Sequence, residues 1–472
     1  MNTEVFIMHT FDISLENITK IEGAASLEVN VKDGKVEKVK FETVEYKRFF
    51  TNAMQGKQIA AIPQHLARIC GTCSNAHIIC AIEACENALG IKPSEQTMLL
   101  RVLALHGLMI RDHGLHLYLF SLPDLYNKDS FLDFDENDPD EHQLLHDGFE
   151  VKSAGNFLAT LIAGRSVHGT YPTIGGFLHF PDKQGIEEAI KKLESARPAV
   201  LRLIEIFKNS PFHFDPVRGR PANPVRNEVS NGAESTATAA TGRPASNGVD
   251  RKTNYMALVP EKSYGYISGK IITSTGESYG EDKFREHLER VVLPYSQASA
   301  YEYKGEGYMV GALARMNLAK NLLHPNTKSS AKEALSIFPS TDIFHNNLAQ
   351  AIEILHSIDE SIEILKNNVF APEPVIKAAS REAVGVGVIE APRGTLYHKV
   401  VIDKDGTVKE GEVIVPTGQN QINIELDIGR LVEQLLLEDM PKEKIEHEIE
   451  KLIRAYDPCM SCAAHFLKVK WQ

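Results

Sequence analysis

Residues 68–77 read RICGTCSNAH and residues 457–465 read DPCMSCAAH, so each stretch holds two cysteines separated by two residues. A histidine follows each pair three or four residues later, and the pairs account for four of the six cysteines in the chain. Two thiolates at this spacing can bind one metal ion, and two such pairs can form a site with four sulfur ligands. Because the pairs lie near opposite ends of the sequence, the chain must fold with its two ends together.

The composition is that of a globular protein. The chain has 472 residues, of which 43% are hydrophobic and 24% are charged, and this length allows one large core or several domains. The formal net charge of −12 argues against nucleic acid as a partner.

The sequence predicts neither a membrane span nor a secretory signal. It has no apolar run long enough to cross a bilayer, and its first residues lack a basic region before an apolar core. We therefore expect a cytoplasmic protein, in which six cysteines bind metal or act in redox chemistry instead of forming a disulfide framework. Export together with a partner that carries a signal is the alternative.

Hydrophobic periodicity predicts a mainly α fold with small β elements. A hairpin is expected at 24–45, around the turn Asp33-Gly34, and a second β segment at 389–416. The helical core is expected at 57–208 and 254–367, and the acidic stretch 127–145 is expected to be a surface loop. The individual helices are expected at 59–89, 95–120, 147–164, 184–208, 283–300, 308–322 and 342–367, with 427–438 and 442–455 leading to the metal motif within 427–465.

Residues 216–250 differ from the rest of the chain. They are rich in Gly, Pro, Asn, Ser, Thr and Ala, and the segments GRPA and SNG each occur twice. Such a segment cannot bury enough apolar surface to offset the entropy of ordering it. We interpret it as a low-complexity mobile insert in a single domain that spans 1–472.

The cysteine spacing alone leaves the type of metal site open. Two Cys-x-x-Cys pairs most often bind structural zinc, although zinc pairs usually lie close together in sequence. Soft thiolates also suit nickel and iron. A structural zinc site and a catalytic thiolate site are therefore both compatible with the spacing.

The residues around the cysteines resemble a known family. Residues 68–77 and 457–465 together are similar to the signature pair of the nickel–iron hydrogenase large subunit. Residues 19–23, 390–394 and 415–420 resemble three further motifs of that family. The resemblance implies the large-subunit fold and the reaction H2 ⇌ 2H⁺ + 2e⁻. Within the family, the chain looks most like the soluble bidirectional NAD(P)-linked and sulfhydrogenase alpha group. The quinone-reducing subunit of respiratory complex I shares the fold but lacks these cysteine pairs.

The resemblance also implies a ligand set. Cys70 and Cys459 match the terminal nickel ligands, whereas Cys73 and Cys462 match the ligands that bridge nickel to iron. The iron in this family carries carbon monoxide and cyanide. A thiolate on a cation has a lowered pKa yet can still accept a proton, and Cys459 is the expected base.

The remaining expected site residues surround that centre. Glu22 matches a proton-relay glutamate; the alternative is a surface carboxylate. Arg393 matches a guanidinium held over the open metal position; the alternative is an ordinary ion pair. Pro392 and Thr417 are expected to surround the diatomic ligands, and Asp124 and Asp457 to act as supporting carboxylates. His77 is expected to donate to a cysteine sulfur.

A second cation is implied at the carboxyl end. His465 resembles a ligand of magnesium or iron, but Thr51 stands where the family has a glutamate ligand, and a hydroxyl binds Mg²⁺ more weakly than a carboxylate does. Glu45 or Glu42 is the alternative ligand. Residues 466–472 match a tail that an endopeptidase removes after nickel insertion; retention as a final strand is the alternative.

The resemblance implies several partners. The chain has no spare cysteine set for iron–sulfur clusters, so electrons require an iron–sulfur small subunit. Flavin or NAD(P) diaphorase subunits are expected beyond it. A maturation endopeptidase and nickel-insertion factors are expected during assembly.

Overall fold

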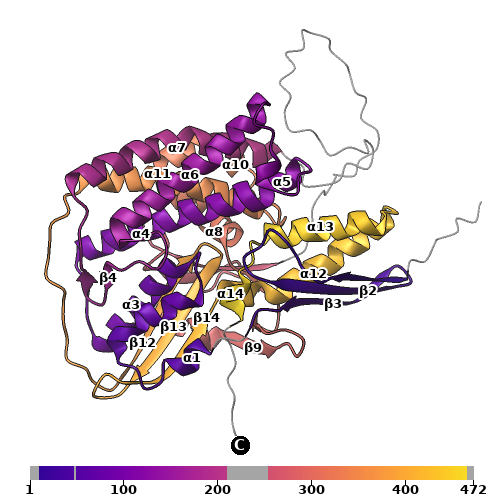
Figure 1. Ribbon diagram of the computed structural model, residues 1–472. Coiled ribbons are helices and arrows are strands. Elements are labelled where there is room, and N and C mark those ends of the chain that lie inside the picture. Colours follow the sequence, from indigo (N-terminus) through magenta and orange to yellow (C-terminus); the bar gives the residue numbers. More distant parts are fainter. Residues whose placement is uncertain (1–9, 47–48, 210–252, 465–472) are drawn as a thin grey trace, which may run out of the picture.

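The computed structural model describes residues 10–46, 49–209 and 253–464, and within them the fold is mainly helical, as predicted. Four long helices pack side by side in the upper part of Figure 1. They are α4 (Glu95–Gly114), α6 (Pro139–Ala163), α7 (Lys183–Asn209) and α11 (His345–Asn367). A π-helical segment, Leu115–Ser121, continues α4 into α5 (Leu122–Leu125).

Local signals fix where these helices begin and end. The Ser94 hydroxyl accepts a hydrogen bond from the Thr97 amide at the start of α4, and the Asp138 carboxylate accepts from two amides at the start of α6. Helix α6 ends at Gly164, whose φ of 83° lies in the left-handed region that favours glycine. Helix α6 therefore begins at Pro139, within the stretch predicted to be an acidic loop, because Asp138 and Pro139 form a strong start signal.

Two antiparallel sheets lie nearer the two ends of the chain. The predicted hairpin forms as β2 (Ala25–Lys32) and β3 (Lys35–Thr43), and β1 (Phe11–Leu15) adds a third strand. The predicted β segment forms the second sheet, with β12 (Ala383–Ala391), β13 (Gly394–Ile402) and β14 (Val408–Ile414).

Helix α3 (Ser74–Leu89) packs directly on β12. A Cβ added at Gly387 would lie 2.3 Å from the Cys80 carbonyl oxygen, and one at Gly385 would lie 2.0 Å from the Ala84 carbonyl oxygen. These glycines allow the helix backbone to touch the strand, which fixes the position of the α3 amino terminus.

The prediction of a helix at 283–300 is wrong. A 3₁₀ helix (Glu281–His287) occupies its beginning, and β9 (Leu288–Val292) and β10 (Ser299–Tyr303) pair antiparallel in its place. Pro294 lies between the strands, where its ring fits a turn and would interrupt a helix. Much of 254–309 is also β structure, with β11 (Tyr308–Met309), β6 (Asn254–Val259), β7 (Lys270–Thr273) and β8 (Ser278–Gly280) in that sheet order.

Other predicted helices differ at their ends. The 308–322 helix is α8 (Ala312–Ala319) followed by a 3₁₀ turn, Lys320–Leu322, and the 427–438 helix is α12 (Pro416–Leu437), which starts at a proline. The 59–89 helix is interrupted before α3 by short turns at Ile59–Ala61, Ile62–Leu66 (α2) and Ala67–Ile69. The remaining short elements are α1 (Phe50–Ala53), β4 (Pro172–Thr173), β5 (Gly176–Phe177), α9 (Pro325–Ser330), α10 (Lys332–Leu335) and a 3₁₀ turn at Phe131–Asp133.

The first and last parts of the chain that the structure describes meet. Helices α13 (Lys442–Ala455) and α14 (Met460–Ala463) lie with α12 beside β2 and β3 in Figure 1, where yellow ribbons meet indigo ones. The Met460 amide donates a 2.8 Å hydrogen bond to the Glu22 carbonyl oxygen, and Glu22 and Cys459 form a parallel β-bridge.

Three predictions concern residues outside the described part of the chain: the insert at 216–250, the ligand His465 and the tail 466–472. Among the described residues, no helix combines the length and the apolar character that a membrane crossing requires.

Candidate metal centre

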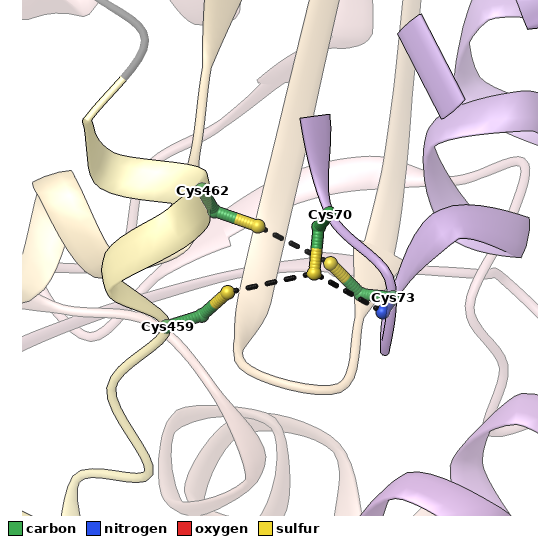
Figure 2. A group of neighbouring side chains, drawn as sticks. All are labelled: Cys70, Cys73, Cys459 and Cys462. Carbon is green, nitrogen blue, oxygen red and sulfur yellow. Dashed lines mark hydrogen bonds between the residues drawn. The ribbon is translucent and has the colours of Figure 1, made fainter. Parts of the chain in front are cut away.

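The four paired cysteines converge, as Figure 2 shows. Their sulfur atoms all lie within 4.8 Å of one another, and all four side chains are buried. Cys70 Sγ lies 3.6 Å from Cys459 Sγ, and Cys73 Sγ lies 3.2 Å from Cys462 Sγ, so each contact joins the two ends of the chain. Four thiolates at about 2.3 Å from one tetrahedral metal lie roughly 3.8 Å apart. The arrangement therefore fits a thiolate-bound metal centre.

The first pair lies at the amino terminus of α3. Cys73 is the residue before the helix, and its amide donates a 3.3 Å hydrogen bond to Cys70 Sγ. An amide at a helix amino terminus stabilises a nearby negative charge. The Arg111 guanidinium of α4 holds the loop by donating to the Thr72 carbonyl oxygen.

The second pair follows a sharp turn. Asp457 has a φ of 50°, in the left-handed region that aspartate tolerates, and this conformation ends α13. The Cys459 amide then donates a 2.9 Å hydrogen bond to the Thr417 hydroxyl at the start of α12. The turn and this bond direct Cys459 toward the first pair.

The cysteine thiols of the cluster differ in pKa. Although burial opposes it, hydrogen bonds from Cys459, Cys462 and Cys73 lower the pKa of Cys70 well below its usual range. Burial raises the pKa values of Cys459 and Cys462. Without metal, loss of protons from several of these thiols is therefore unfavourable. A bound dication would allow all four thiols to lose their protons.

Glu22 contacts the cluster. Its Oε2 lies 2.7 Å from Cys459 Sγ, and its Oε1 lies 3.9 Å from Cys70 Sγ. Burial and the neighbouring Cys70 raise the pKa of Glu22 to about 7. A carboxyl group with this pKa can both take and release a proton near neutral pH.

Arg393 is held between two carboxylates. It lies in the two-residue turn between β12 and β13, which closes at Gly394 with a φ of 129°. Its Nη1 donates to Asp112 at 2.8 Å and its Nη2 donates to Asp457 at 2.9 Å. Asp112 is not among the residues predicted from the sequence, although a carboxylate within the strongly apolar helix at 95–120 is a signal that could identify it.

A second buried arginine supports the same turn. Arg315 of α8 pairs with Glu353 of α11 and Glu390 of β12, in both cases at 2.6 Å. It also donates to the carbonyl oxygens of Ala391 and Pro392 at 3.1 Å. Because buried charges need complete pairing, this cluster fixes the turn that carries Arg393.

A small pocket lies against the sulfur atoms. Arg393 extends along it, and its other lining residues include Pro392, Thr417, His77, Cys459 and Cys462. His77 Nε2 lies 3.6 Å from Cys462 Sγ, and burial lowers the pKa of His77 to about 4. The pocket places one fixed positive charge beside the sulfur atoms of Cys73, Cys459 and Cys462, an arrangement that a closed structural zinc site does not need.

Two predicted residues lie elsewhere. Asp124 pairs with Arg454 at 2.9 Å and with Lys20 at 2.6 Å, and it does not line the pocket. Thr51 lies in α1. The Glu45 carboxylate accepts a hydrogen bond from the Ala24 amide at 3.1 Å and lies near Met460, the first residue of α14.

Comparisons with known proteins agree with this geometry. The family described as "Nickel-dependent hydrogenase" matches residues 48–159 and 270–465. Sulfhydrogenase 2 subunit alpha of Pyrococcus furiosus is 30% identical over 461 residues, which covers 97% of this chain and 100% of the relative. Sulfhydrogenase 1 subunit alpha of the same organism is 28% identical, covering 97% and 98%. A solved NAD⁺-reducing [NiFe]-hydrogenase, 22% identical, shares the fold with a TM-score of 0.77, covering 97% of this chain and 100% of the other.

Proposed function

This chain belongs to the nickel-dependent hydrogenase family, and we propose that Cys459 and Glu22 carry the protons of its reaction, H2 ⇌ 2H⁺ + 2e⁻. The observation that supports this assignment most strongly is the 2.7 Å contact between Cys459 Sγ and Glu22 Oε2 at the four-thiolate cluster. A nickel–iron centre held by Cys70, Cys73, Cys459 and Cys462 supplies the chemistry that cleaves and forms the H–H bond.

Cys459 and Glu22 move the proton in sequence. The Cys459 thiolate accepts a proton at Sγ, and the adjacent Glu22 carboxylate takes it at Oε2. The pKa of about 7 lets Glu22 pass that proton on toward solvent near neutral pH. In the direction of H2 formation, the same groups deliver protons to the cluster.

Arg393 provides a fixed positive charge at the pocket. Its guanidinium cannot lose its charge, and the bonds to Asp112 and Asp457 hold it at the pocket that Cys459 lines. A fixed positive charge beside reacting atoms needs no reorganisation during the reaction. Pro392 and Thr417 line the same pocket, and we assign to it the carbon monoxide and cyanide ligands of the iron.

A second cation and carboxyl-terminal processing belong to the same proposal. Magnesium or iron would bind His465, and the Glu45 carboxylate, which lies near Met460, would take the role for which the Thr51 hydroxyl is a weaker ligand. Removal of 466–472 by a maturation endopeptidase, after nickel-insertion factors have acted, would complete the site.

Electrons must leave through a partner. Within the described residues, Cys80 and Cys85 are the cysteines outside the cluster, and each contacts backbone carbonyl oxygens inside the core. An iron–sulfur small subunit therefore accepts the electrons, and flavin or NAD(P) diaphorase subunits follow it. The NAD-reducing hydrogenase HoxS subunit beta of Cupriavidus necator, 26% identical over 489 residues, supports the NAD(P)-linked assignment. We place this enzyme in the cytoplasm.

A substitution of Cys459 tests the proposal. Cys459→Ser in the assembled enzyme should lower hydrogen turnover at least about 100-fold, because general acid–base catalysis contributes that much or more. Its circular dichroism should remain unchanged, since Cys459 lies between α13 and α14 and outside both helices. Cys85→Ser makes the same chemical change outside the cluster and should retain turnover.

Metal analysis and infrared spectroscopy of the wild-type enzyme complete the test. Nickel and iron together with carbonyl and cyanide bands are expected. Zinc alone would indicate a structural site, and no metal would indicate a cofactor-free relative of the complex I subunit. Full turnover by Cys459→Ser would show that another group is the base.

A further inference from the structure

We propose that His398 is a positioning residue that sets the tautomer of His77 and thereby directs an N–H group at Cys462 Sγ. This inference rests on the proposed function, because it concerns a sulfur atom that would bind metal. Nothing in the sequence motifs points to His398, which lies in the middle of β13.

The two imidazoles and the sulfur form a chain of contacts. His77 Nε2 lies 3.6 Å from Cys462 Sγ, and His77 Nδ1 lies 3.1 Å from His398 Nε2. The ring centroids lie 5.3 Å apart and the planes are inclined by only 25°, so the two nitrogens meet edge to edge between nearly coplanar rings. Both side chains are fully enclosed by protein.

The chemistry of a neutral imidazole determines the direction of both hydrogen bonds. Such a ring carries one N–H group and one acceptor nitrogen, and a metal-bound thiolate can only accept. His77 therefore donates from Nε2 to Cys462 and accepts at Nδ1. His398 must then donate from Nε2. The opposite tautomer of His77 would direct a lone pair at the sulfur, which is repulsive.

The fold holds the two rings at this distance. In β13, Leu396, His398 and Val400 alternate on a buried face, so a histidine interrupts an apolar row. Its neighbour across the sheet is Gly387, where α3 touches the strand. Because His77 is on α3, the contact at Gly387 also fixes the separation between His77 and His398.

The hydrogen bond from the His77 Nε2–H group withdraws electron density from the Cys462 thiolate. Outer partners that orient a ligand typically change metal affinity or activity by about 10- to 100-fold when they are removed. We expect His398→Leu to lower hydrogen turnover by about that factor. We also expect its carbonyl and cyanide infrared bands to shift to lower wavenumber, since the thiolate would donate more charge to the iron.

His398→Gln is the rescue variant. Its amide N–H can donate to His77 Nδ1, so its bands should return toward those of the wild-type enzyme. His345→Leu removes a half-buried histidine whose side chain contacts Ser340 and Phe338, neither of them a cluster residue, and it should leave the bands unchanged. Unshifted bands in a His398→Leu enzyme that contains nickel and iron would overturn the inference while leaving the proposed function intact.

A measurement on the unsubstituted protein covers the case in which His398→Leu does not fold. Nitrogen-15 spectra of the zinc-loaded chain, assigned with His77→Gln, report which nitrogen of His77 carries hydrogen. We expect Nε2 to be protonated and Nδ1 to be bare. A proton on Nδ1 would overturn the inference. By contrast, a wild-type enzyme without nickel, iron and diatomic bands would overturn the proposed function itself.

Discussion

The position of Glu22 in the folded chain determines its acidity. On the sequence it could be a surface carboxylate beside a hairpin, but in the structure it is half-buried and contacts Cys459. Water stabilises a carboxylate far better than a protein interior does, so burial raises the pKa of Glu22, and the neighbouring Cys70 raises it further, to about 7. The same burial therefore makes the group useful for proton transfer and costly for folding.

This cost predicts a pH dependence in the metal-free chain. The pKa is 4.5 for the unfolded group and about 7 for the folded one, so between these values the folded state binds the extra proton. The stability of the fold must then decrease as pH rises through this range, by about 3 kcal/mol in total. Glu22→Gln lacks the titration. Its melting temperature should exceed that of the unsubstituted chain by more at pH 8 than at pH 5.

The control is Glu28→Gln, which changes an exposed carboxylate on β2. Its melting temperature should follow that of the unsubstituted chain across the same pH range. A constant difference between Glu22→Gln and the unsubstituted chain would show that Glu22 does not take up a proton on folding.

At the scale of elements, the packing of α3 on β12 positions the first cysteine pair. The helix backbone touches the strand at Gly385 and Gly387, and Cys73 directly precedes the helix. A methyl group at Gly387 has no space and would push α3 away from the sheet. We expect Gly387→Ala to destabilise the protein by about 1–3 kcal/mol, as overpacking does, and to lower its nickel content.

Gly429→Ala is the matched control. Gly429 lies within α12, and an added Cβ there would meet only ordinary contacts, at 3.6 Å and beyond. Alanine favours a helix over glycine by about 1 kcal/mol, so this variant should melt at the same temperature or higher. Equal melting temperatures and nickel contents for both variants would contradict the role given to the contact at Gly387.

At the scale of the whole molecule, the metal centre joins the two ends of a chain that is otherwise held by its own core. The helices α4, α6, α7 and α11 pack on one another, whereas Cys70 and Cys73 meet Cys459 and Cys462 only at the cluster. A ligand that binds the folded state alone stabilises the regions that it contacts. Metal should therefore act locally, on both ends at once.

Hydrogen exchange can test this expectation. Metal loading should slow amide exchange in residues 70–77 and 457–464 together, by at least about 10-fold, while α6 and α7 remain unchanged. The α6 and α7 amides serve as the internal control. Slower exchange throughout the chain would instead mean that the metal is required for folding of the entire molecule.

Sequence patterns were enough to predict the class of fold, most of the long helices, the hairpin of β2 and β3, the strands β13 and β14, and the four cysteines that the fold brings together. These features depend on local periodicity and on residue types whose chemistry is specific, such as paired cysteines. The sequence also determined that the chain ends must meet, because one metal cannot bind two distant pairs otherwise.

The other features depend on contacts between elements that are distant in sequence. The strands at Leu288–Val292 and Ser299–Tyr303 form because they pair with each other, and such pairing overrides a helical pattern. Likewise, Asp112 rather than Asp124 contacts Arg393, and His398 of β13 contacts His77 of α3. These contacts join residues far apart in sequence, and their partners are fixed by packing between elements, which no local pattern records.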